Sequence, residues 1–134
     1  MRIILDTGPL VALLNRKDAL HAWSVEQAGR MAPPFHSCEA VVAEAHYLLR
    51  TVHDGKTRLI DLLNSGRIGL GFSVADHHYR VGELMLGYAN IPMSFADACL
   101  VCMAEQQKST IFTLDSDFNI YRKHRKDPLQ LLTP

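Results

Sequence analysis

The stretch Arg2-Ile3-Ile4-Leu5-Asp6-Thr7-Gly8-Pro9-Leu10 opens the chain, and its apolar half decides the fold class. Three large apolar residues in succession, ending at a carboxylate, predict a strand buried on both faces in the middle of a parallel sheet. Asp6 then lies at the carboxyl end of that strand, at the edge where open α/β sheets bind their ligands. The alternative is structural: Asp6 or Thr7 caps a helix that begins near Pro9.

The rest of the chain alternates short apolar segments with segments of helical periodicity. Further strands are expected at residues 35–38, 68–74, 111–114 and 129–132, and helices at residues 9–15, 20–31, 39–52, 57–65, 75–88 and 94–108. Residues 122–126 are expected to form a basic connection. Strands alternating with helices predict an α/β fold, in which a parallel sheet is covered by helices on both faces.

Composition narrows the class of protein. A chain of 134 residues that is 48% hydrophobic and 21% charged predicts a single globular domain over residues 1–134. The 14 basic and 14 acidic residues cancel, whereas a protein that coats nucleic acid needs a basic surface to neutralise phosphates. Nucleic acid binding would therefore depend on a local basic patch or on a metal ion. The chain shows no signal-peptide pattern and no apolar run near the roughly 20 residues of a membrane span, so we expect a cytoplasmic protein.

The three cysteines are expected to be reduced and buried. Cys99 and Cys102 have C-x-x-C spacing, but they lie inside an apolar helical run, whereas a redox pair belongs at the first turn of a helix. No second C-x-x-C pair is present to complete a zinc site. Cys38 stands alone in an apolar setting, which also indicates a core residue.

Four carboxylates are candidates for chemistry, although each also has a structural interpretation. Asp115 follows a predicted strand, as Asp6 does, but it can form an Asx turn, as can Asp117. Asp97 begins a predicted helix and can form a capping box with the residue three before it. Glu44 lies in the middle of an apolar helix, where it is either an exposed residue or faces a polar cleft.

As a set, the four carboxylates indicate a metal site. The ends of parallel strands meet at one edge, and helices that begin nearby can bring Glu44 and Asp97 to Asp6 and Asp115. Two carboxylates at 4 Å repel by about 1 kcal/mol in water, and by several times more when partly buried, so such a cluster needs a cation. Oxygen ligands without histidine or cysteine favour Mg²⁺ or Mn²⁺. Such an ion can bind a phosphodiester and activate the attacking water.

Four motifs, taken in order, resemble the PIN-domain family, and within it the VapC-type toxins of bacterial toxin–antitoxin pairs. The motifs are Ile4-Leu5-Asp6-Thr7-Gly8-Pro9-Leu10, Val42-Ala43-Glu44 followed by Tyr47-Leu48-Leu49, Ser94-Phe95-Ala96-Asp97-Ala98, and Thr113-Leu114-Asp115-Ser116-Asp117-Phe118. They span essentially the whole chain, and their ordered combination is more specific than any one of them. The resemblance implies a three-layer α/β/α sandwich with a central, mostly parallel five-stranded sheet. It also implies a Mg²⁺- or Mn²⁺-dependent endoribonuclease, the toxin of a type II pair.

The resemblance assigns roles to individual residues. Asp6, Glu44, Asp97 and Asp115 match the acidic quartet that holds the metal and carries catalysis, and Asp117 is a fifth ligand or an orienting group. The small hydroxyl residues Thr7 and Ser37 lie where they can hydrogen-bond a carboxylate or a water molecule beside the metal. The family likeness further implies a homodimer and an antitoxin protein that binds at the acidic cleft.

Substrate contacts are expected from basic residues. One candidate group for RNA binding comprises Arg122, Lys123, Arg125 and Lys126, and a second comprises Arg16 and Lys17. The alternative is that these are solvated surface charges that contribute little energy.

Two other functions remain open, and a third lacks a residue that it needs. The chain can be a housekeeping RNA-processing PIN nuclease without an antitoxin, or a catalytically silent PIN module that binds another protein. A phosphatase like the haloacid dehalogenases, with Asp6 as nucleophile, would need a second aspartate two residues later, where this chain has Gly8.

Overall fold

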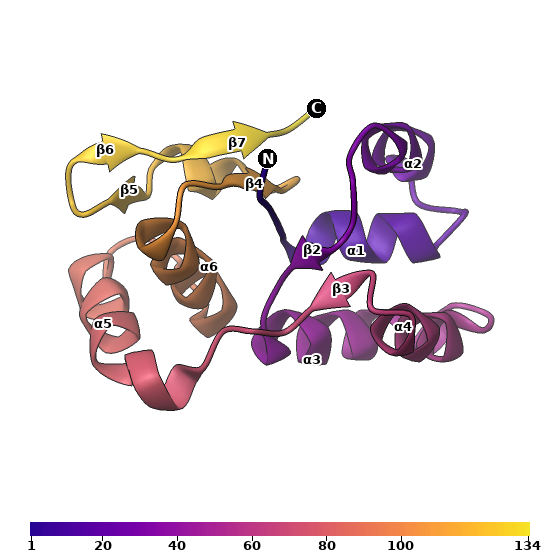
Figure 1. Ribbon diagram of the computed structural model, residues 1–134, viewed down its shortest axis with the longest axis horizontal. Helices are drawn as coiled ribbons and strands as arrows, with labels where there is room; N and C mark the ends of the chain where they lie inside the picture. Colours follow the sequence, from indigo (N-terminus) through magenta and orange to yellow (C-terminus); the bar gives the residue numbers. More distant parts are fainter.

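Five parallel strands form the central sheet of the computed structural model, which describes residues 1–134 (Figure 1). They are β1 (Ile3–Leu5), β2 (Phe35–His36), β3 (Ile68–Gly69), β4 (Thr110–Phe112) and β7 (Gln130–Leu132). Their order across the sheet is β3-β2-β1-β4-β7, and every neighbouring pair is parallel. The strand β1 is central and its three residues are at most 2% exposed, so the prediction made from the opening stretch is confirmed.

Helices cover both faces of the sheet, which completes the predicted three-layer α/β/α sandwich (Figure 1). The helices are α1 (Thr7–Leu14), α2 (His21–Gly29), α3 (Glu39–Leu48), α4 (Gly55–Asn64), α5 (Val74–Gly87) and α6 (Phe95–Gln106), with 3₁₀ turns η1 (Leu49–Thr51) and η2 (Ser116–Asn119). Helix α6 packs against α5, β1 and β4 and is buried without interruption from Ala96 to Ala104. The cysteines are free and buried, as predicted. None of the helices is long and apolar enough to span a membrane.

Element boundaries differ from the prediction in places where a local cap decides them. Helix α1 begins at Thr7 because the Asp6 carboxylate accepts the Thr7 N–H at 2.8 Å. The strand predicted over residues 68–74 is only Ile68–Gly69, since Ser73 caps α5 by accepting the Asp76 N–H at 3.3 Å. The helix predicted over residues 39–52 is α3 followed by η1.

The basic segment at residues 122–126, predicted to be a connection, belongs to a small antiparallel hairpin. Strands β5 (Arg122–Lys123) and β6 (Asp127–Pro128) pair with each other. His124 and Arg125 form its turn with φ angles of 52° and 62°, a left-handed conformation uncommon for residues other than glycine.

Candidate active site

Acidic side chains from several elements line one cavity at the carboxyl ends of β1 and β4. The cavity has a volume of about 650 Å³ and brings together all five acids named from the sequence: Asp6, Glu44, Asp97, Asp115 and Asp117. Its other lining residues are Thr7, Gly8, Leu48, Pro92, Ser94 and Leu114. No lysine, arginine or histidine lines the cavity. The negative charge of the acids is therefore not offset by any side chain of the cavity wall.

Asp6 is the most deeply buried of these acids and uses both of its oxygens. Oδ1 accepts the Thr7 N–H at 2.8 Å, and Oδ2 accepts the Thr113 hydroxyl at 2.6 Å. The residue is 6% exposed. Burial raises the pKa of Asp6 to about 6, with a smaller contribution from the charges of Asp97 and Asp115, although the two hydrogen bonds oppose the rise. Asp6 is thus both a helix cap and a cavity residue.

Asp97 also combines a cap with a place in the cavity. Its N–H donates to the Ser94 hydroxyl at 3.0 Å, and its Oδ2 accepts the Ser94 N–H at 3.2 Å, which forms the predicted capping box. The Tyr121 hydroxyl lies 3.1 Å from the same Oδ2 and 2.9 Å from the Pro92 carbonyl. Burial raises the pKa of Asp97, and the charge of Asp115 adds to the rise, against the lowering effect of the Ser94 and Tyr121 hydrogen bonds.

The remaining acids lie closer to solvent. Glu44 is exposed, and its Oε2 accepts the Thr7 hydroxyl at 2.9 Å, which ties α3 to the start of α1. Asp115 and Asp117 form the predicted Asx turn at the beginning of η2, where Asp115 Oδ1 accepts the Asp117 N–H at 2.9 Å. Thr7 therefore contacts a carboxylate, one of the two roles expected for it.

Two residues that the sequence did not single out hold the acids in place. Thr113 is fully buried, donates to Asp6 and accepts the Asp115 N–H at 3.0 Å. Its position, after a buried strand and two residues before an acid, is a signal that could have identified it. Tyr121 follows Asp97 by 24 residues, a spacing that carries no such signal. Burial raises the pKa of Tyr121, as does the neighbouring charge of Asp97, so its hydroxyl stays protonated and able to donate.

Ser37 does not contact any acid. It is fully buried, and its hydroxyl donates to the Leu5 carbonyl at 2.9 Å, so it joins β1 to the connection between β2 and α3. Nor does it cap α3, whose N-cap is Cys38. Of the two contacts expected for Ser37, the structure shows none with a carboxylate, because a backbone carbonyl of the central strand accepts its proton. The contact with a water molecule beside the metal stays a prediction.

The basic group at residues 122–126 lies outside the acidic cavity and is partly engaged. The Arg122 guanidinium donates to the carbonyls of Asn119, Ile120 and Tyr121 at 2.7–3.2 Å. Arg125 forms an ion pair with Glu83 at 3.3 Å. Lys123 and Lys126 form no ion pair.

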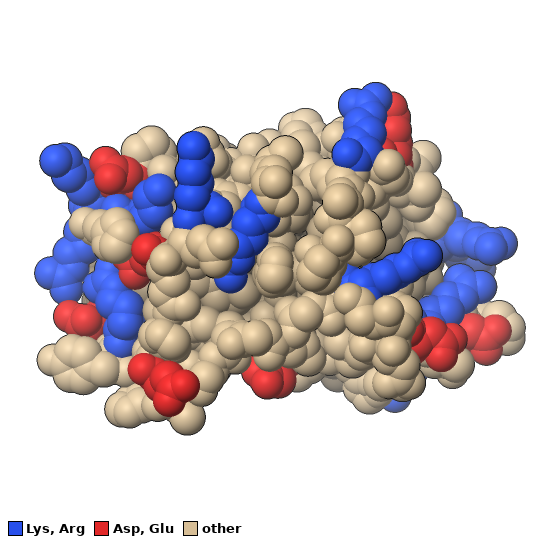
Figure 2. All heavy atoms as spheres, in the orientation of Figure 1, with Lys and Arg blue, Asp and Glu red and all other residues tan.

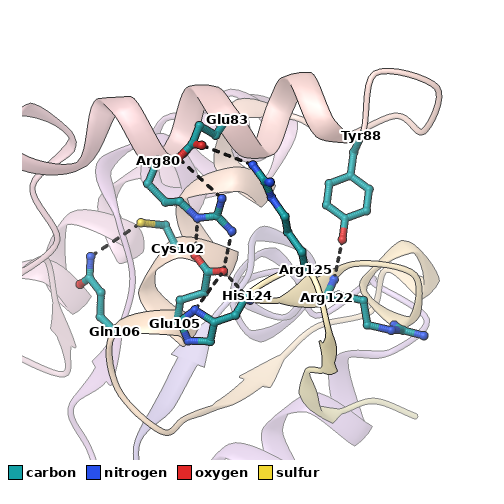
Figure 3. A network of polar contacts seen from close by, with 9 residues as sticks. All are labelled: Arg80, Glu83, Tyr88, Cys102, Glu105, Gln106, Arg122, His124 and Arg125. Atoms are coloured by element: carbon teal, nitrogen blue, oxygen red, sulfur yellow. Dashed lines mark hydrogen bonds and ion pairs between the residues drawn. The ribbon is translucent and has the colours of Figure 1, made fainter.

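A buried carboxylate anchors the hairpin that carries this basic group (Figure 3). Glu105 accepts hydrogen bonds from Arg80 at 2.8 and 2.7 Å and from the His124 N–H at 2.6 Å, and its side chain is 6% exposed. Burial alone would raise the pKa of Glu105, but these hydrogen bonds and the Arg80 charge outweigh burial and lower it. The Arg122 N–H also donates to the Tyr88 hydroxyl at 2.8 Å. The hairpin is thereby fixed next to Tyr121.

The donor chemistry of the acidic cavity suits a hard divalent cation. All its charged groups are carboxylates, and burial and mutual repulsion already disfavour the ionised form of Asp6. As the side chains stand, however, no three acids, histidines or cysteines converge closely enough to hold an ion between them. The acids thus form a cavity into which a cation fits electrostatically, while their role as metal ligands stays a prediction.

Comparisons with known proteins agree with this architecture. The model of a family described as PIN domain matches residues 3–124. The crystal structure of VapC20 from Mycobacterium tuberculosis, described as a toxin that cleaves the sarcin–ricin loop, has the same fold, with a TM-score of 0.79. The two chains are 21% identical, and the match covers 88% of this chain and 93% of VapC20. No curated protein shows significant sequence similarity to the chain.

Proposed function

Because the chain belongs to the PIN-domain family, we propose that it is a Mg²⁺- or Mn²⁺-dependent endoribonuclease and the toxin of a type II toxin–antitoxin pair. The observation that carries this proposal is the single cavity lined by five carboxylates and by no cationic side chain. The fold shared with VapC20, a toxin that cleaves RNA, supports the toxin assignment. An antitoxin bound at the acidic cavity, a homodimer and a cytoplasmic location are parts of the same proposal.

The acids would hold the cation, and their neighbours keep them in position. Asp6, Glu44, Asp97 and Asp115 are the proposed ligands, with Asp117 as a fifth ligand or orienting group. When bound, the cation polarises the phosphodiester, activates the attacking water and offsets the charge of the acids.

The supporting hydrogen bonds come from this chain alone. Thr113 bridges Asp6 and the Asp115 backbone, Tyr121 and Ser94 hold Asp97, and Thr7 holds Glu44. Positions fixed in this way reduce the reorganisation needed when a charged substrate arrives.

Cleavage of a labelled RNA by the purified protein tests the enzyme assignment. Wild type is expected to cut in Mn²⁺, to stop cutting in excess chelator, and to recover when Mn²⁺ is restored. Asp6→Asn should lower the rate by about 100-fold or more while the circular dichroism spectrum is unchanged. Asp61→Asn removes an exposed acid of α4 outside the cavity and should cut like wild type. Full activity of Asp6→Asn, or cleavage in chelator, would contradict the proposal.

Inducible expression in a bacterial host tests the toxin assignment separately. Growth should arrest with wild type and continue with Asp6→Asn, and co-expression of the neighbouring reading frame should restore growth. RNA cleavage in vitro without any growth arrest would instead indicate an RNA-processing enzyme.

A further inference from the structure

A second cavity, lined by cations, lies at the opposite end of α1 from the acids. Its volume is about 410 Å³, and its lining residues are Leu14, Asn15, Arg16, Lys17, Thr51, Val52, His53 and Arg58. No aspartate or glutamate is among them. Figure 2 shows lysine and arginine side chains gathered at this end of the molecule, over the connections from α1 to α2 and from α3 to α4, as well as at the hairpin end.

The three permanent charges of this cavity have no internal partner. None of the ion pairs in the structure involves Arg16, Lys17 or Arg58. The carboxylates nearby are Asp54, whose Oδ2 lies 3.2 Å from His53 Nε2, and Asp61, which shares an adjoining shallow depression with Arg58. At the hairpin end Arg122 is bound to carbonyls and Arg125 to a glutamate, which leaves Lys123 and Lys126 unpaired. The α1 end therefore offers one more unpaired cation, and its three cations line a cavity.

Two elements run from the acidic cavity to the basic one. Helix α1 begins with Thr7 in the acidic cavity and ends with Leu14 in the basic cavity, a length of about 10 Å at roughly 1.5 Å per residue. Helix α3 and η1 make the same connection, since Leu48 lines the first cavity and Thr51 the second. A strand that enters the acidic cavity can therefore continue along these elements to the cations.

An exposed aromatic–cation pair lies on α3 and η1, in the sequence between Glu44 of the acidic cavity and Thr51 of the basic cavity. Tyr47 is 61% exposed, and the Arg50 guanidinium lies 3.8 Å from the centre of its ring. Exposed aromatic rings and arginine planes are the surfaces on which proteins stack the unpaired bases of single-stranded RNA. The side chains along this path thus suit bases as well as phosphates.

We propose that the basic cavity binds phosphate groups of the RNA strand whose scissile bond lies in the acidic cavity, an inference that rests on the proposed function. A neutral chain with an acidic cleft repels a polyanion, so a strand needs a local positive site to remain bound. Arg16, Lys17 and Arg58 provide that site about one helix length away. Lysine and arginine are the side chains that usually neutralise backbone phosphates.

The salt dependence of RNA binding tests this proposal without requiring cleavage. Binding of a fluorescein-labelled single-stranded RNA is measured by anisotropy in excess chelator over a range of salt concentrations, for wild type and for a Lys17→Gln/Arg58→Gln double variant. The slope of log K against log[salt] should fall by about 0.7 for each phosphate that the protein no longer neutralises, so by about 1.4 in the double variant. The matched control, Arg30→Gln/Lys108→Gln, removes the same charge outside both cavities and should keep the wild-type slope.

The other outcomes of this experiment are distinct. An unchanged slope in Lys17→Gln/Arg58→Gln together with a reduced slope in Lys123→Gln/Lys126→Gln overturns the proposal and places the strand on the hairpin. Equal reductions of the slope in the test and control variants also overturn it, since net charge alone then explains binding.

Failure of the proposed function gives a different result. A wild type that binds RNA with the predicted salt dependence but never cuts it refutes the nuclease and supports the phosphate site. A wild type that cuts RNA with the double variant unchanged in slope and in KM refutes only the phosphate site.

Discussion

The hydroxyl of Thr113 donates the hydrogen bond to Asp6 Oδ2, the carboxylate oxygen that the Thr7 N–H does not contact. It donates to Asp6 Oδ2 at 2.6 Å and accepts the Asp115 N–H at 3.0 Å, and the residue is fully buried. No other hydrogen bond reaches that oxygen of Asp6. A buried charge without its partner carries the full cost of its desolvation, so this hydroxyl matters both to stability and to the ionised state of the site.

Thr113→Val is expected to weaken the protein and the site together. Valine keeps the shape of the side chain but cannot donate, so the free energy of unfolding should fall by about 1–3 kcal/mol. The pKa of Asp6 should rise further, because this hydrogen bond is one of the two that lower it. Urea unfolding and Mn²⁺-dependent RNA cleavage measure the two effects. Thr110→Val, three residues earlier in β4 and without a side-chain hydrogen bond, is the control; equal behaviour of the two variants would contradict this role.

Single residues were predictable from the sequence only where a charged side chain stood at an unusual position of a predicted strand or helix. Asp6 and Asp115 could be named because each follows a predicted buried strand, and Glu44 because it lies in the middle of an apolar helix. The sequence left open whether Asp6 and Asp97 were caps or site residues, and the structure shows that each caps a helix and lines the cavity. Tyr121 could not be found, because its contact with Asp97 depends on how a hairpin folds back over α6.

At the scale of elements, the hairpin β5–β6 is held by one carboxylate of α6. Glu105 binds Arg80 of α5 and the backbone of His124, whose φ of 52° is a strained conformation for histidine (Figure 3). The positive φ angles at two residues other than glycine explain why the sequence predicted only a connection here. The tertiary contact with Glu105 stabilises a turn that local backbone preferences do not favour.

Glu105→Gln should destabilise the protein by about 2–3 kcal/mol, because it leaves the partly buried Arg80 without its main counter-charge. Glu26→Gln removes an exposed pair with Arg30 and should cost less than about 0.5 kcal/mol. Glu105→Gln should also hold the hairpin next to Tyr121 less firmly. Tyr121 should then hold Asp97 less well, and the rate of RNA cleavage should fall. Urea denaturation at neutral pH compares the two variants, and a cost as small as that of Glu26→Gln would contradict the anchoring role.

The same pair predicts a pH dependence of stability. The pKa of Glu105 in the folded protein is lower than its ordinary value, so its contribution is complete above the ordinary glutamate pKa. That contribution is lost as the pH falls through the lowered pKa. The stability difference between wild type and Glu105→Gln should therefore be constant near neutrality and shrink in acid. A difference that grows in acid would reverse the sign and contradict the assignment.

Most elements could be predicted from periodicity, and the exception has a physical reason. The alternation of apolar residues with Gly69 and Gly71 suggested a strand over residues 68–74, but only Ile68–Gly69 pairs with β2. Beyond that point the backbone leaves the sheet, and Ser73 begins α5. Because the cap at Ser73 begins a helix, the alternation of apolar residues with glycine does not continue as a strand.

On the scale of the whole molecule, a net charge of zero conceals a separation of charge. Five acids line one cavity, and three unpaired cations line another on the far end of α1. The overall fold was predictable because the apolar strands and helices alternate regularly along the chain. The basic cavity was not, since Arg58 joins Arg16 and Lys17 only after α4 packs beside α1.

Mn²⁺ is expected to stabilise the folded protein as a whole. A ligand that binds only the folded state adds about 2.7 kcal/mol at a hundred times its Kd, and a cation bound among the acids would also relieve the repulsion around Asp6. The thermal midpoint of wild type should therefore rise with Mn²⁺ concentration and return to its starting value with chelator. Asp6→Asn should respond far less, whereas Asp61→Asn should respond like wild type. An equal rise in all three proteins would indicate binding elsewhere.

The position of β1 at the centre of the sheet has a consequence for synthesis of the protein. Its residues leave the ribosome well before those of β4, yet the two strands pair, and Ile3 is the partner of Thr110. Asp6 likewise gains its second hydrogen bond only when Thr113 is present, and the Thr113 hydroxyl in turn accepts the Asp115 N–H. A nascent chain that has not reached Asp115 cannot assemble the complete acidic cavity. The nuclease proposed above would in this way become active only after Asp115 and Asp117 have left the ribosome.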